Sequence, residues 1–327
     1  MKATSLLKRI GWLAFALTAS LSSNANAALL AYDPFAYGND PAQGQYALGV
    51  EGTPVNTPGT DLLGGQNPSI GPTAFYNGAW IQSGGDAQVV KALPSLAYST
   101  FQAGIGGIQQ ETNQFSCCSF GRTGREIAGG LGGGRSASTI YQSFLIDFGT
   151  QGTDDPTQFG KRGYEMWSDG IGDAFLAVDL FVNSFAGVND LSLAVTTLGN
   201  GTTIVPLNGG GLDLSTLAGT HLVVMKFAFD PTNPDLVSVF LDPTNSNESD
   251  WTPAAFVSVA TSDLLISHHG AFTEFTFSGL GHIPGAIDEI RWGDTFADVT
   301  PFGVPEPAGL SLFLLGILGV AFSRRRQ

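Results

Sequence analysis

Two adjacent carboxylates are the first residues of this sequence that suggest chemistry. Asp288 and Glu289 lie in the segment Ala286 to Trp292, which has the composition of a strand. A retaining glycosidase uses two carboxylates about 5 Å apart, one as the nucleophile and the other as the acid and base. Adjacent residues of a regular strand point to opposite faces, so we predict that these two do not cooperate. Glu289 and Arg291 share one face and are expected to form an ion pair.

Side chains that bind metals are few and poorly spaced. Asp169 and Asp173 lie in one turn and offer oxygen ligands for Ca²⁺, but their spacing is not that of an EF-hand loop. We expect solvated turns both there and at Asp242 to Asp250. His268 and His269 look like an exposed pair, and no H-E-x-x-H pattern accompanies them. We therefore predict no cofactor, with Ca²⁺ at the first turn as the one candidate ion.

Activated nucleophiles are not evident either. Cys117 and Cys118 are the only cysteines and are adjacent, so they can close only a strained ring and are expected to be free or buried in a loop. The serines lack a G-x-S-x-G pattern. The glycine run Gly129 to Gly134 lacks the lysine of a phosphate-binding loop and ends a segment, Gly104 to Arg135, that we interpret as a flexible surface loop. We therefore predict no catalytic residue and no enzymatic activity.

The composition favours a β protein that does not bind nucleic acid. The chain has 327 residues, with 44 glycines, 17 prolines and only 13% charged residues. Such a composition is typical of short strands joined by many turns. The net charge is −14, and six of the 14 Lys and Arg residues lie in the two terminal segments. Because an acidic surface repels phosphate backbones, we expect no nucleic-acid partner.

Alternating apolar residues predict most strands in the second half of the chain. After Thr139, even spacing places Ile140, Phe144, Ile146 and Phe148 on one face. Similar runs, separated by turns rich in Gly, Pro, Asn and Asp, follow at 174–182, 190–197, 221–230, 236–242, 254–260, 272–277 and 286–292. No helical pattern lies between these runs. The series predicts an antiparallel β-sandwich.

The first part of the body is less regular. From Leu29 to about Val90 the sequence is rich in Gly, Pro and Asn. We interpret it as one strand followed by long loops, because no apolar residue recurs at helical spacing for more than a turn. The aromatic residues of Tyr32 to Tyr37, together with Trp80, are candidate core anchors. A carbohydrate platform is the alternative use for such aromatic side chains.

The N-terminus has the features of an export signal. A basic start, an apolar run from Ile10 to Leu21 and an A-x-A site formed by Ala25 and Ala27 predict that residues 1–27 are a Sec signal peptide. The Sec translocon is therefore an expected partner. The basic residues at both ends of the chain should stay cytoplasmic, so the segment between them is expected to cross the membrane.

The C-terminal segment 302–327 resembles the PEP-CTERM sorting signal of exosortase-type bacterial systems. Three features in order carry the resemblance: Pro305, Glu306 and Pro307; an apolar run from Ala308 to Phe322; and a basic end at Arg324, Arg325 and Arg326. The resemblance implies that a membrane exosortase recognises and cuts this tail while its helix holds the chain in the membrane. A plain membrane anchor is the alternative, although the apolar run is short for a full crossing.

Residues 28–301 resemble the concanavalin A-like, laminin-G-like jelly-roll domain. The segments that carry this resemblance are Tyr32 to Gly38, Thr139 to Gly149, His221 to Phe227, Asp235 to Pro243, Ala286 to Gly293 and Phe296 to Pro301. The resemblance implies an all-β, antiparallel jelly-roll sandwich between a signal peptide and a C-terminal helix. Folds of this kind occur in lectins, glycoside hydrolases and inert modules, so the fold alone does not select a function.

We expect an exported bacterial protein of the cell surface or extracellular matrix, with a structural or adhesive role in extracellular polysaccharide. A lectin-like carbohydrate-binding module is the alternative, in a Ca²⁺-dependent form if Asp169 and Asp173 bind the ion. A glycoside hydrolase ranks third.

Processing at both ends is directly testable. Mass spectrometry of the mature surface protein should find an N-terminus at Ala28 and a C-terminus within or near Val304 to Ala308. An intact Arg326-Gln327 end on the mature surface protein would contradict the sorting hypothesis.

Overall fold

The structure is a computed structural model that describes 15 strands and the turns next to them. The described residues are 29–35, 75–84, 88–91, 95–99, 101, 108–111, 121–132, 138–149, 159–168, 176–183, 188–197, 201–213, 216–259, 264–276 and 285–302. Within these ranges, no helix has the length and apolar character that crossing a membrane requires. Several residues singled out above lie outside them: Ala25, Ala27, Cys117, Cys118, Asp169, Asp173, Pro305, Glu306, Pro307, Arg324, Arg325 and Arg326.

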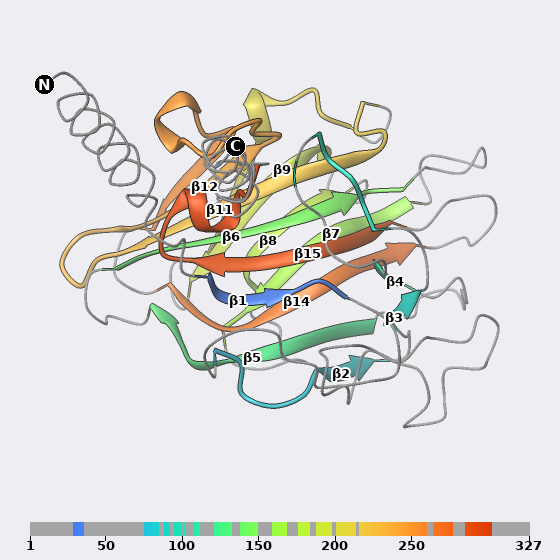
Figure 1. The fold of residues 1–327 in the computed structure, drawn as a ribbon, viewed down its shortest axis with the longest axis horizontal. Coiled ribbons are helices and arrows are strands. Elements are labelled where there is room, and N and C mark those ends of the chain that lie inside the picture. The colour runs from blue at the N-terminus through green and yellow to red at the C-terminus, as the bar shows by residue number, and fades with distance from the viewer. Residues whose placement is uncertain are drawn as a thin grey trace, which may run out of the picture.

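The described strands form two antiparallel sheets that pack face to face (Figure 1). The eight-stranded first sheet has the order β13 (Ala255–Val259), β12 (Asp235–Leu241), β11 (Thr220–Phe229), β6 (Ser138–Asp147), β15 (Ala286–Gly293), β4 (Ile108–Glu111) and β3 (Gln88–Lys91), with β1 (Leu29–Asp33) also paired to β15. The seven-stranded second sheet has the order β10 (Gly201–Pro206), β9 (Val188–Thr197), β8 (Leu176–Asn183), β7 (Phe159–Trp167), β14 (Leu265–Thr276), β5 (Gly121–Gly132) and β2 (Ile81–Gly84). The predicted antiparallel β-sandwich is confirmed.

The core lies between the two sheets and uses the residues that the alternation predicts. Phe144 and Ile146 of β6 are fully buried there, as are Met225 and Phe227 of the neighbouring β11. Phe35 and Trp80 belong to the same core, and their ring centroids lie 6.0 Å apart. The interpretation of these two aromatic residues as core anchors is therefore confirmed.

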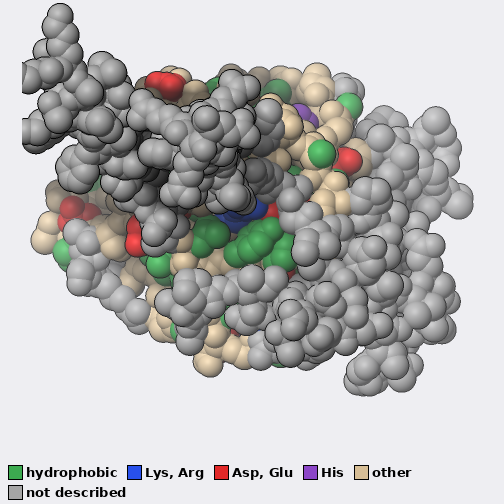
Figure 2. Space-filling model, in the orientation of Figure 1, with side chains coloured by type: hydrophobic (Ala, Val, Ile, Leu, Met, Phe, Trp, Pro, Cys, Tyr) green, Lys and Arg blue, Asp and Glu red, His purple; other side chains and the backbone are tan. Residues whose placement is uncertain are grey.

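A second apolar cluster covers the outer face of the first sheet. Leu145, Val224 and Phe240 point away from the core and pack under α2 (Phe296–Val299). A capping box begins this short helix: the Asp298 N–H donates to Thr295 Oγ1, and the Thr295 N–H donates to Asp298 Oδ2. Figure 2, drawn from this side, shows basic and apolar side chains close together in the middle of the face.

The glycine-rich segment is a strand in its second half, which corrects the prediction of a surface loop. β5 lies inside the second sheet, between β14 and β2. Its regular alternation is hidden because Thr123 and Arg125 occupy buried positions where an apolar residue would signal a strand. Gly132, at φ +77°, lies against the Phe229 ring, so that a Cβ would come within 2.6 Å of it and would overlap the Leu264 carbonyl. Of the other strands, β2, β3, β4, β7 and β10 are also not predicted by the pattern.

Substitutions at two glycines can distinguish the packing requirement at Gly132 from the requirement for a left-handed backbone. Gly132 and Gly201 both have a left-handed φ, +77° and +79°, but a Cβ on Gly201 would have no neighbour within 4 Å. Gly201→Ala is expected to lower the free energy of unfolding by about 1–2 kcal/mol because of the backbone alone. Gly132→Ala adds a steric clash and is expected to cost about 1–3 kcal/mol more. Equal losses in urea unfolding of the two variants would contradict the packing of β5.

Candidate functional site

The acidic pair of β15 lies at a β-bulge. Asp288 is opposite Leu145 and Arg291 is opposite Ser143, so three steps along β15 face two along β6. Glu289, inside the bulge, has φ +57°, a left-handed conformation that is costly for a residue with a side chain. Because Leu145 and Ser143 both point to the outer face, Asp288 and Arg291 do as well.

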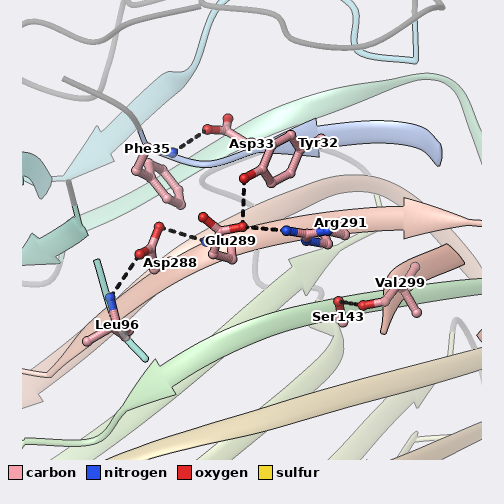
Figure 3. Close-up of polar contacts among 9 residues, drawn as sticks. All are labelled: Tyr32, Asp33, Phe35, Leu96, Ser143, Asp288, Glu289, Arg291 and Val299. Atoms are coloured by element: carbon pink, nitrogen blue, oxygen red, sulfur yellow. Dashed lines mark hydrogen bonds and ion pairs between the residues drawn. The ribbon is translucent and has the colours of Figure 1, made fainter. Parts of the chain in front are cut away.

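Glu289 points to this outer face too, so the prediction that Asp288 and Glu289 point to opposite faces is wrong (Figure 3). The Tyr32 hydroxyl donates to Glu289 Oε2 at 2.7 Å, and Arg291 Nη2 donates to the same oxygen at 2.8 Å. Tyr32 lies opposite Arg291 on β1, and the guanidinium lies 4.6 Å from its ring centroid. The ion pair predicted between Glu289 and Arg291 is confirmed. The extra residue of the bulge explains the change of face, because it ends the simple alternation.

Asp288 accepts hydrogen bonds from two backbone amides. Its Oδ1 accepts from the Glu289 N–H at 2.8 Å and its Oδ2 from the Leu96 N–H at 3.0 Å. Burial, and next the negative charge of Glu289, raise the pKa of the Asp288 carboxyl well above its usual range. Both carboxylates are completely buried. We call Tyr32, Asp288, Glu289 and Arg291 the bulge network, and we interpret it as a joint between β1, β15 and the segment at Leu96.

The two adjacent histidines lie on opposite faces of the second sheet, and both are buried. His269 points into the core beside Met166, whereas His268 points to the outer face opposite Trp167. The exposed fraction is 0% for His269 and 8% for His268, so the expectation of an exposed pair is wrong. Neighbouring strands cover both sides of β14, which the sequence pattern alone does not reveal.

A second acidic pair lies across two strands of the second sheet. Glu165 of β7 is directly opposite Asp179 of β8. Their neighbours Tyr164 and Leu180 point into the core, so both carboxylates lie on the outer face. Side chains at such paired positions have Cβ atoms about 4.5–5.5 Å apart, and like charges there are destabilising. Both side chains are buried nonetheless.

An aromatic side chain lies beside this pair. Trp167 is two residues from Glu165 along β7 and therefore on the same face. It is completely buried, and its indole N–H has no hydrogen-bond partner among the described residues. Gly270 of β14 allows the ring to lie against the strand, since a Cβ there would be 2.7 Å from Trp167 Cη2. We call Glu165, Trp167, Asp179 and His268 the outer-face cluster.

Asp242, from the turn at Asp242 to Asp250, forms polar contacts within the first sheet. Asp242 accepts hydrogen bonds from the Leu222 N–H at 3.0 Å, and its Oδ2 lies 2.8 Å from His221 Nδ1. Its carboxylate thus fixes the start of β11. Within the described ranges, no three His, Cys, Asp or Glu side chains are grouped as a metal site requires.

The sequence analysis missed the outer-face cluster because its members lie on three strands. In β7, Tyr164 and Met166 alternate with Glu165 and Trp167, a signal that would have predicted this strand. Asp179 stands alone in an apolar run. The pairing of Glu165 with Asp179 depends on strand register, which a single sequence does not display.

Comparisons with known proteins find likenesses of fold. No family model matches the chain, and no curated protein matches its sequence. An endo-β-1,4-glucuronan lyase from the fungus Trichoderma reesei is 13% identical over 68% of this chain and 91% of its own, with a TM-score of 0.39. Lectin II from Ulex europaeus is 10% identical over 65% and 92%, with a TM-score of 0.36. A carbohydrate esterase of the Shiga toxin-encoding bacteriophage phi24B is 14% identical over 66% and 90%, with a TM-score of 0.36.

These distant matches correct the prediction that the chain is not an enzyme. The solved structures that resemble it include a lyase and an esterase as well as lectins. The exclusion of enzymatic activity therefore does not stand. A fold that carries several activities does not select among them, so the function has to be argued from the side chains.

The burial of His269 predicts a specific pH dependence of stability. Burial and the positive charge of Arg125 hold the pKa of the His269 imidazole well below its ordinary value. As the pH falls below about 6.5, the unfolded chain binds a proton that the folded chain does not, so stability decreases by up to about 1.4 kcal/mol per pH unit. His269→Gln removes this contribution. In urea unfolding, the difference in stability between the two proteins should therefore shift between about pH 7 and about pH 5. A constant difference over that range would contradict a buried neutral histidine.

Proposed function

We propose that this chain is an exported protein that binds a neutral extracellular polysaccharide on the outer face of its second sheet. The observation that carries the proposal is the outer-face cluster. It places two opposed carboxylates, Glu165 and Asp179, beside the unpartnered indole N–H of Trp167.

The chemistry of the outer-face cluster suits sugar hydroxyls. Carboxylate oxygens accept charge-assisted hydrogen bonds from hydroxyl groups, and an indole N–H donates one. Trp167 is completely buried, so its ring can offer apolar surface to the C–H face of a sugar only when the outer-face cluster opens to solvent. The cluster therefore combines polar groups that fix orientation with a ring that supplies contact area.

The contrast between the two outer faces supports a binding role. The outer face of the first sheet is closed by apolar residues such as Leu145, Val224 and Phe240, which need no further partner. The buried charges on that face, Asp288, Glu289 and Arg291, belong to the bulge network. The outer face of the second sheet buries Glu165, Asp179 and Ser192. Glu165 and Asp179 also interact with other groups of the protein, so the proposal depends on the kinds of side chain gathered on this face and not on a missing partner.

The charge of the chain restricts the class of polysaccharide. A protein with a net charge of −14 repels polyanions, and the two carboxylates of the cluster add to this locally. The proposal is therefore a neutral polymer. The proposal also includes export and exosortase sorting through the C-terminal tail. These steps would deliver the β-sandwich to the extracellular matrix, where it has a structural or adhesive role.

The proposal is tested by binding to insoluble neutral polysaccharides such as cellulose, curdlan, mannan and starch. The wild-type protein is expected to bind at least one of them. The double variant Glu165→Gln, Asp179→Asn keeps the side-chain shapes but removes both charges. Since hydrogen bonds to charged groups contribute about 1.5–3 kcal/mol each, affinity should fall about tenfold or more.

Glu248→Gln is the matched control, because Glu248 lies outside the second sheet and bonds Tyr141 and Lys226. It should bind like the wild type. Equal binding by the double variant, or no binding of any polymer by the wild type, would rule out the proposed site. Addition of EDTA to the same assay tests the alternative that binding depends on Ca²⁺ held by Asp169 and Asp173.

A further inference from the structure

A group of polar side chains interrupts the apolar core between the two sheets. Gln142 of β6 lies opposite Trp292 of β15, and both point inward. Gln142 Nε2 donates to the Tyr164 hydroxyl at 2.5 Å, and that oxygen lies 3.4 Å from His269 Nδ1. The ring of Tyr76 lies 4.9 Å from the ring of His269. We call these five residues the interior polar cluster.

Four atoms of this cluster are buried and make no hydrogen bond of ordinary length and angle with the described residues, although the Trp292 indole interacts weakly with the Tyr76 hydroxyl. They are Gln142 Oε1, His269 Nε2, Trp292 Nε1 and Tyr76 Oη. Gln142, His269 and Trp292 are each completely buried. The ring of His269 lies 6.0 Å from that of Trp292, so these atoms belong to one region and not to separate parts of the core.

The four atoms form a complementary set of donors and acceptors. The Trp292 indole nitrogen only donates, and the Gln142 carbonyl oxygen only accepts. The Tyr76 hydroxyl can do both. If the Tyr164 hydroxyl donates to His269 Nδ1, the other ring nitrogen, Nε2, carries the proton and donates. A molecule able to donate and accept at once is therefore needed to satisfy them together.

The charges nearby select a neutral molecule. The Arg125 guanidinium lies 4.4 Å from the Tyr76 ring centroid, which disfavours a cation. The carboxylate of Asp33 lies 3.7 Å from Arg125, so the positive charge is balanced within the protein and does not call for an anion. Buried polar groups of native proteins are almost always satisfied, and internal water with two to four polar partners is the usual means.

We propose that the interior polar cluster binds ordered water between the two sheets. The water accepts from Trp292 Nε1 and donates to Gln142 Oε1, with His269 Nε2 and Tyr76 Oη as further partners. Trp80 packs 5.0 Å from the His269 ring, and Phe35 packs against Trp80, so aromatic side chains separate the water from solvent. Exchange with bulk water therefore requires local opening and is slow. This inference is independent of polysaccharide binding.

The test uses the wild-type protein first. A high-resolution crystal structure should show a density peak within hydrogen-bonding distance of at least two of the four atoms. Oxygen-17 relaxation dispersion in solution should detect the corresponding long-lived water. A map in which these atoms bond each other directly, with no peak between them, overturns the proposal whatever the behaviour of variants.

Two variants then test whether the long-lived water signal comes from the interior polar cluster. Gln142→Met removes the acceptor at similar volume and should reduce the long-lived water contribution in the dispersion experiment. Ser143→Ala, at the next residue of β6, changes the outer face, where Ser143 Oγ donates to the Val299 carbonyl. This control should leave the water contribution unchanged. An unchanged amplitude in folded Gln142→Met, or an equal reduction in both variants, overturns the assignment to this cluster.

Discussion

The buried ion pair between Glu289 and Arg291 is the interaction on which the arrangement of the first sheet depends. It stabilises a residue with left-handed backbone at the bulge of β15, a strand that pairs with β1, β4 and β6. The Tyr32 hydroxyl joins the same carboxylate from β1, so the beginning and the end of the sandwich are held side by side. Removing one partner of a buried pair leaves an uncompensated charge and typically costs about 3–5 kcal/mol. The bulge network is therefore a structural joint.

This joint also contributes to closing the outer face of the first sheet. Arg291 lies 4.9 Å from the ring of Phe101, and Phe101 packs against Phe302 beyond α2. The outer face of the first sheet is thus closed by residues anchored at the bulge. The outer face of the second sheet has a different character, because Glu165, Asp179 and Trp167 are buried there. The proposed binding site follows from this asymmetry between two sheets of similar size.

Much of the fold could be predicted from the sequence, because most strands have one face in the core. The alternation of Phe144, Ile146 and Phe148 predicts β6, and similar runs predict β8, β9, β11, β12, β13 and β15. β5 is hidden by its glycines and by buried Arg125, whose polar side chain disguises an inward position. The bulge misled the prediction for Asp288 and Glu289, since one extra residue changes the face of a side chain. The pairing of Glu165 with Asp179 could not be predicted, because they lie 14 positions apart in the sequence and only strand register brings them together.

The central claim is that ligand binds at the outer-face cluster, and the indole N–H signals of the tryptophans test it most directly. Trp167 belongs to the cluster, Trp80 and Trp292 lie in the core, and Trp251 packs beside the apolar cluster of the first sheet. In a ¹H–¹⁵N spectrum recorded with increasing concentrations of a neutral oligosaccharide, the account predicts that the Trp167 indole signal shifts and saturates. The signals of Trp80, Trp292 and Trp251 should stay in place. A saturating shift of Trp251 with an unmoved Trp167 would contradict the account.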